Sequence, residues 1–97
     1  MRNASVDVAD AAVPMPEGVD GLSVLDDAGF DAAVTRLARV DAGPVGIIVG
    51  DADDDTCARV AVLVMMGAVA VRTSDPEHVA RVTNVIDALL GRVTVGA

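Results

Sequence analysis

The chain has 97 residues, of which 53% are hydrophobic and 23% charged, and its formal net charge is −8. This length allows one modest core and excludes a complete eight-stranded (β/α) barrel, which takes roughly 250 residues. All the basic residues are Arg, Tyr and Trp are absent, and Phe30 is the single aromatic residue. Because a nucleic-acid binder needs clustered basic groups and stacking surfaces, we expect no nucleic acid among the ligands.

The cysteine content and the hydropathy pattern restrict the class further. The single cysteine, Cys57, excludes an internal disulfide and a zinc site built from cysteine pairs. Residues 1–25 contain no basic segment followed by an apolar one, so no secretory signal is predicted. No run of 18 uncharged apolar residues occurs, so we expect no membrane-spanning segment. Together these features predict a soluble cytoplasmic protein.

The chain divides into a lead-in and one domain. Residues 1–19, with Pro14 and Pro16 on either side of Met15, predict an irregular and partly mobile segment with at most a short strand at Val6–Ala9. Residues 20–97 predict a single α/β domain. It opens with a strand at 22–25 and a helix from Asp26 to about Val40. The expected buried face of that helix has helical spacing and comprises Phe30, Ala33, Val34 and Leu37.

The middle of the domain is the most apolar part. Residues 45–49 form a continuous apolar run, which is typical of a parallel strand covered on both faces. Residues 56–66 have Arg59 as their only strongly polar member and fit either a helix or a strand. The acidic residues before this segment and the strands around it favour the helix. Such a helix is apolar nearly all round and has to be covered on most sides.

A third strand and a third helix end the pattern. Residues 68–72 predict the strand, and Asp75-Pro76-Glu77 has the composition of a helix N-terminus. Gly91 is placed to end the helix, and 92–97 predict a short strand or a frayed end. The expected buried stripe of the helix is Val79, Val82, Ile86 and Leu89. The whole pattern predicts an α/β, βαβαβα half-barrel-like unit, with a short parallel sheet and flanking helices.

A binding site in such a sheet is expected at the carboxyl ends of the strands. Arg72, Thr73 and Ser74 lie between a strand end and a helix N-terminus, where a guanidinium, two hydroxyls and free N–H groups can bind a small anion. The alternative is that Arg72 pairs with Asp51 or Asp75 and that Ser74 supports the helix cap.

Three other groups could each form a site or have a purely structural role. Asp51, Asp53 and Asp55 are weak candidates for a metal site, although carboxylates before a helix more often cap it. His78 is expected to be a solvated surface residue. Cys57 lies near a helix N-terminus, which lowers a thiol pKa, but a buried inert thiol is favoured. We predict no metal, no cofactor and no catalytic residue.

Residues 44–91 carry a family resemblance. The stretch begins PVGIIVG, Thr56 starts a helix, Gly67-Ala68 precede a strand, and Val71-Arg72 with Asp75 match a "VR…D" frame. This order resembles the C-terminal part of the dihydropteroate synthases, which are pterin-binding TIM barrels. The resemblance implies a barrel fragment with an anion or pterin-phosphate site at Arg72.

The departures from that family concern its chemistry. The family's Arg-x-His anion site falls on Arg72-Thr73-Ser74, so the His position is Ser74. The acidic Asp51–Asp53 segment stands where the family has a basic turn, and the chain has no lysine to contact a pterin. The resemblance therefore implies a truncated, degenerate, non-catalytic relative, a pseudoenzyme.

Response-regulator receiver domains offer an alternative resemblance, because they share the order of strands and helices. Asp26 would be the phosphate acceptor, and Arg72 would replace the usual lysine. The first strand pair of that family, with its acidic metal-binding residues, is missing.

The predicted unit is too small to cover its own apolar surfaces. Open sheet edges and uncovered helix faces favour a partner. We therefore expect a homodimer or a larger protein partner, together with a possible small anionic ligand. The function predicted from the sequence is oligomerisation or docking, and the alternative is a degenerate signalling module.

Overall fold

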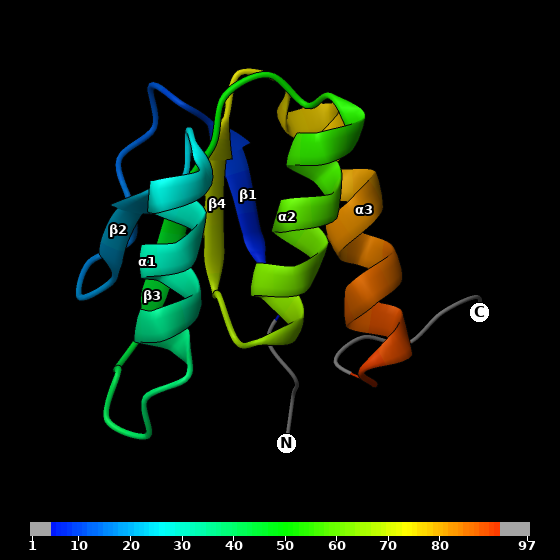
Figure 1. The fold of residues 1–97 in the computed structure, drawn as a ribbon. Helices are drawn as coiled ribbons and strands as arrows, with labels where there is room; N and C mark the ends of the chain where they lie inside the picture. The colour runs from blue at the N-terminus through cyan, green and yellow to red at the C-terminus, as the bar shows by residue number, and fades with distance from the viewer. Residues whose placement is uncertain (1–4, 92–97) are drawn as a thin grey trace.

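The computed structural model describes residues 5–91 and confirms the α/β class. Its sheet has the strands β1 (Asp7–Asp10), β2 (Asp20–Ser23), β3 (Val45–Ile48) and β4 (Ala70–Thr73). The helices are α1 (Asp27–Leu37), α2 (Asp54–Met65) and α3 (Pro76–Leu89). The sheet order is β1-β4-β3-β2, and all neighbouring strands are parallel (Figure 1). The predicted tail at 92–97 lies outside the described residues.

The three helices form one layer against one face of the sheet (Figure 1). Each βαβ connection places the next strand beside the previous one, so that β2, β3 and β4 are neighbours in chain order. The core lies between the helices and the sheet. Its buried members come from every helix and include Ala33 of α1, Leu63 of α2, Val79 of α3, and Ile47 and Val71 of the sheet.

The segment 56–66, which fits two secondary structures in sequence, is helical. Asp53 caps α2 by accepting a hydrogen bond from the Thr56 N–H at 2.7 Å, and Asp54 and Asp55 lie in the first turn. Carboxylates in these positions complement the positive end of the helix dipole. The positive φ of Gly67, +119°, then lets the chain turn into β4.

The lead-in differs from the expected irregular segment because residues 7–10 form a fourth strand. β1 pairs with β4 over four residues, from Asp7 opposite Ala70 to Asp10 opposite Thr73. It therefore occupies the position that a strand following α3 would take in a longer β/α series. A hydrogen bond of 3.0 Å from the Val6 N–H to the buried Asp87 carboxylate links this end of the chain to α3.

Residues 11–19, which we call the strap, connect the two edge strands β1 and β2. The strap packs on the sheet face opposite the helices, where Gly46 and Gly21 have no side chains. Met15 fills that space, because a Cβ on Gly46 would lie 2.6 Å from the Met15 sulfur and one on Gly21 would lie 3.2 Å from its Cγ. The strap thus takes the place of a second helical layer.

The expected buried stripe of α3 is partly wrong. Val79 and Ile86 are buried, as predicted, but the side chain of Leu89 is 76% exposed. Two polar side chains, Thr83 and Asp87, are buried instead. The inner face of α3 is therefore rotated toward the strand β1, which the sequence pattern did not indicate.

Candidate functional site

The carboxyl ends of the parallel strands lie together at one edge of the sheet (Figure 1), as the predicted architecture requires. The loops after β3 and β4 meet there. The Ser74 hydroxyl donates to the Asp51 carboxylate at 2.8 Å, and the Thr73 hydroxyl donates to the Gly50 carbonyl at 2.9 Å. Thr73, Ser74 and Asp51 therefore lie close to one another at this edge. Their hydrogen bonds connect the loop after β3 to the loop after β4.

Arg72 does not join that group. Strand alternation points its side chain to the strap face of the sheet, and the residue is only 3% exposed. Nε donates to the carbonyl oxygens of Val13 and Pro14 at 3.0 and 3.3 Å. The guanidinium therefore lies beneath the strap, away from the edge where an anion was expected.

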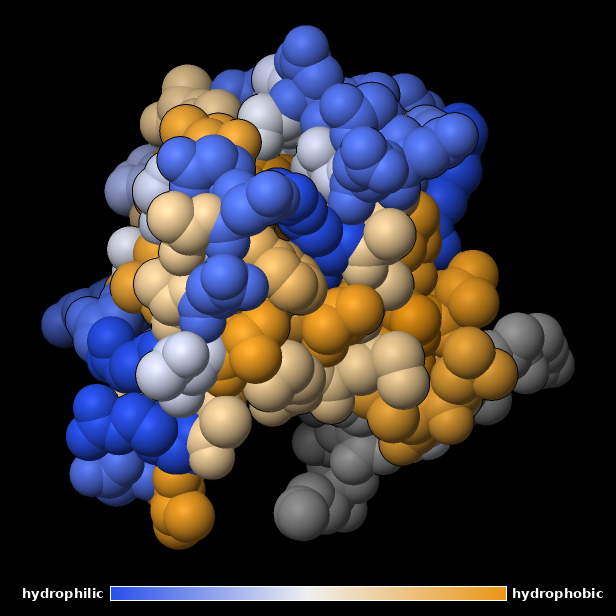
Figure 2. Space-filling view, viewed as in Figure 1, coloured by the Kyte–Doolittle hydropathy of each residue, from blue (hydrophilic) through white to orange (hydrophobic). Residues whose placement is uncertain are grey.

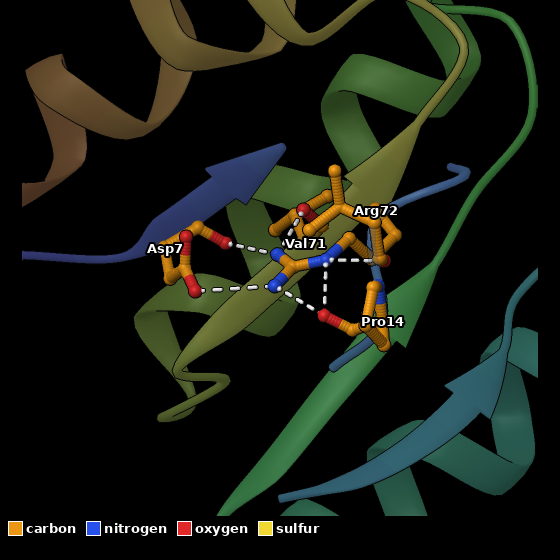
Figure 3. A network of polar contacts seen from close by, with 5 residues as sticks. Asp7, Pro14, Val71 and Arg72 are labelled. Carbon is orange, nitrogen blue, oxygen red and sulfur yellow. Dashed lines mark hydrogen bonds and ion pairs between the residues drawn. The ribbon is translucent and has the colours of Figure 1, made fainter. Parts of the chain in front are cut away.

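The guanidinium has an acceptor for each of its N–H groups (Figure 3). Nη1 donates to the carbonyls of Asp7 and Val71, and Nη2 donates to the Pro14 carbonyl and the Asp7 carboxylate at 3.0 and 3.1 Å. An arginine carries five N–H donors in a fixed fork, and here all of them are used. The structure does not assemble the predicted anion site from Arg72, Thr73 and Ser74, because the charged member is engaged in holding β1 and the strap.

The structure also does not gather the candidate metal ligands. Asp51 accepts from Ser74, whereas Asp53 caps α2 and Asp55 lies in its first turn. Over residues 5–91, no group of three or more His, Cys, Asp or Glu side chains is placed to hold a metal ion. The capping role of Asp53 is the structural alternative that the sequence already favoured.

Cys57 is half-buried, and its thiol lies 3.8 Å from the Ala52 carbonyl. Burial raises the pKa of this thiol, and the carboxylates of Asp54, Asp53 and Asp75 raise it further. Burial and the nearby carboxylates together therefore outweigh the helix N-terminus, which alone would lower the pKa of the thiol. A raised pKa favours the protonated thiol, and this supports the alternative in which Cys57 is inert.

Two other carboxylates at this edge cap helices. Asp26 caps α1 by accepting from the Gly29 N–H at 2.7 Å, and Asp75 accepts from the His78 N–H at 3.3 Å. His78 itself is exposed in the first turn of α3. Asp26, the acceptor in the receiver-like alternative, thus has its carboxylate oxygen directed at a helix N-terminus.

The Asp53 cap predicts a dependence of stability on pH. The hydrogen bonds from Thr56 lower the pKa of the Asp53 carboxyl in the folded chain. A lowered pKa stabilises the fold fully above the unfolded-state value, and this contribution is lost as the pH falls through the folded-state value. Urea unfolding of Asp53→Asn below pH about 4 should therefore show a weaker acid dependence than the native chain.

Asp53→Ser and Asp53→Ala separate the charge from the cap. Serine keeps a capping oxygen but does not titrate, so Asp53→Ser should resemble Asp53→Asn. Asp53→Ala loses the cap and should also unfold at lower urea at neutral pH. An acid dependence unchanged in all three variants would contradict the role given to this carboxylate.

An apolar surface stands out elsewhere in the molecule. On the C-terminal halves of α2 and α3, exposed side chains lie side by side (Figure 2), and we call this surface the α2–α3 patch. Met65 is 59% exposed and Leu89 76% exposed. The patch consists of Val62, Met65, Val85, Leu89 and Leu90. The sequence predicts uncovered apolar helix faces and indicates the helix at 56–66 as one of them, but it does not indicate the part of the patch on α3.

Comparison with known protein families, with curated proteins and with solved structures finds no match to this chain. None of the helices within the described residues has the length and apolar character needed to cross a membrane.

Proposed function

We propose that this chain is a non-catalytic docking module and that the α2–α3 patch is its contact surface. The observation that carries the proposal is the exposure of five large apolar side chains on two adjacent helices. Scattered exposed apolar residues are ordinary, but a contiguous patch of them marks an interaction surface. In a chain that lacks Tyr and Trp, aliphatic and Met side chains such as these have to supply the apolar contacts with a partner.

Two features favour the patch over the sheet edges as the contact surface. The edge strands β1 and β2 have four residues each, and Asp occupies both ends of β1 and the first position of β2. Short, charged edge strands are the usual protection against strand addition. A helix-mediated contact is therefore the better supported form of the docking that the sequence predicts.

The non-catalytic part of the proposal is supported by how the reactive groups are used. Arg72 holds the strap and β1, and the pKa of the Cys57 thiol is raised. A fragment derived from a pterin-binding barrel remains our interpretation of residues 44–91. The continuous order β2-α1-β3-α2-β4-α3, with its helices on one face, is compatible with such an origin. The anion site is left out of the proposal because Arg72 has no donor to spare.

A site-specific photo-crosslinker tests the docking function in the host cell. We expect a benzoylphenylalanine at Leu89 to form a covalent adduct of defined higher mass. The matched control is the same group at Thr35, which is also exposed but lies on α1. Absence of an adduct from Leu89, or the same adducts from both positions, would count against the proposal.

A further inference from the structure

The α2–α3 patch lies away from the exposed carboxylates of α2 and α3. Residues 60–71 contain no charged side chain, and in 82–91 the only one is Asp87, which is fully buried. Carboxylates gather instead at the opposite end of these helices, where α2 begins with Asp54 and Asp55 and α3 carries Glu77 in its first turn. On the right of the view, over α2 and α3, Figure 2 shows this division as a hydrophilic upper end and an apolar lower part.

This division restricts the kind of partner that fits. The five side chains of the patch carry no charge, so charged groups of a partner placed directly on them would lose their hydration without compensation. Interfaces between identical subunits are more apolar than those of transient complexes of different proteins. The patch therefore fits a partner whose contact surface is also apolar. A second copy of the chain has such a surface.

The helix termini supply an electrostatic argument for the same partner. Within residues 5–91, neither α2 nor α3 has a basic residue in its last turn, so no side chain of the helix itself lies beside the negative end of its dipole. Arg81 is exposed on α3, and the spacing 81, 85, 89 places it on the same stripe as Val85 and Leu89. The stripe thus has the Arg81 cation at one end and the negative C-terminal end of the α3 dipole at the other.

We propose that two copies of this chain associate through their α2–α3 patches, with the two α3 helices antiparallel about a two-fold axis near Val85. This inference rests on the proposed docking function and names its partner. With the axis at that position, Arg81 lies level with Leu89 of the second copy, beside the last turn of its α3. The acidic ends of the two copies then lie at opposite ends of the dimer, which limits repulsion between two chains of charge −8.

Sedimentation equilibrium of the purified chain gives the first test. The native chain is expected to be a dimer at micromolar concentration. Leu89→Asp should raise the dimer dissociation constant at least about 100-fold, since it places two buried charges in the interface. Met65→Asp is a second variant of the same design, and circular dichroism verifies that each variant is folded. The control is Val40→Asp, because Val40 is fully exposed in the loop after α1 and lies outside the patch.

The Arg81 variants and a cysteine variant test the arrangement. Arg81→Glu should weaken the dimer about tenfold, whereas Arg81→Lys should retain most of the affinity. In a Cys57→Ala background, Val85→Cys should form a disulfide-linked dimer on mild oxidation, and Thr35→Cys should not. A monomeric native chain, a dimer unaffected by both Asp substitutions, or cross-linking through Thr35→Cys would overturn the inference. A monomer that still gives the Leu89 photo-adduct with another protein would overturn only this partner and leave the docking function standing.

Discussion

Replacing Arg72 with Met is expected to destabilise the fold by about 3–5 kcal/mol, because the substitution removes all the side-chain donors by which Arg72 holds β1 and the strap. Three backbone carbonyls, those of Asp7, Val13 and Pro14, would lose a charged donor at 2.9 to 3.3 Å. These hydrogen bonds are part-buried, so a carbonyl that loses its donor keeps part of its desolvation cost. Urea unfolding followed by circular dichroism measures the loss, since the chain has no Trp or Tyr for fluorescence.

Matched variants separate this network from ordinary surface charge. Arg59→Met removes an ion pair to Asp27, whose side chain is 90% exposed, and should cost less than about 1 kcal/mol. Arg72→Lys keeps a charge but loses the planar fork, so it should fall between the two and should speed amide hydrogen exchange in the strap. If Arg72→Met unfolded at the same urea concentration as Arg59→Met, the strap would not depend on the guanidinium.

Gly29→Ala is expected to cost at least about 2 kcal/mol, although alanine is the better helix former by about 1 kcal/mol. Gly29 lies in the first turn of α1, where the helix passes very close to the end of β2. A Cβ at this position would lie 2.5 Å from the Ser23 carbonyl oxygen and 3.2 Å from the Val24 Cα. Both contacts are with backbone atoms, so the helix itself has to move away from the sheet.

Gly50→Ala is the control for that substitution. A Cβ on Gly50 would meet only the end of the Leu25 side chain, at an ordinary 3.8 Å. This variant should therefore unfold within about 0.5 kcal/mol of the native chain. A Gly29→Ala chain as stable as Gly50→Ala would show that α1 can shift at little cost, in contrast to the close packing described here.

Local sequence patterns predicted most of the secondary structure because each element carries its own signals. The apolar run at 45–49 and the Asp75-Pro76 start of α3 needed no distant partner to be recognised. β1 was indicated only weakly, since four residues give little periodicity and its pairing with β4 joins positions more than 60 residues apart. Short strands of this kind are determined by tertiary pairing.

The candidate site was also only partly predictable, because the residues that contact Arg72 are distant in sequence. Its position at a strand end made Arg72 an attractive anion ligand, but its acceptors on Asp7, Val13 and Pro14 are 58 to 65 residues away in sequence. The apolar composition of α2 likewise could not distinguish the buried Val60 from the exposed Val62. A signal for Arg72 was nevertheless present, because an arginine within an apolar strand has to be paired if it is buried.

The pairing of β1 with β4 also affects how the chain acquires its structure. The first strand emerges from the ribosome early, yet the edge it joins is not available until residue 73 has been synthesised. Contacts of such long sequence separation require the closure of a large loop and slow the search for the native state. Strands β2 and β3 can pair beforehand through the short α1 crossover. We therefore expect the N-terminal residues to join the sheet late, so that a ribosome-bound chain ending before β4 is digested readily by protease within residues 5–19.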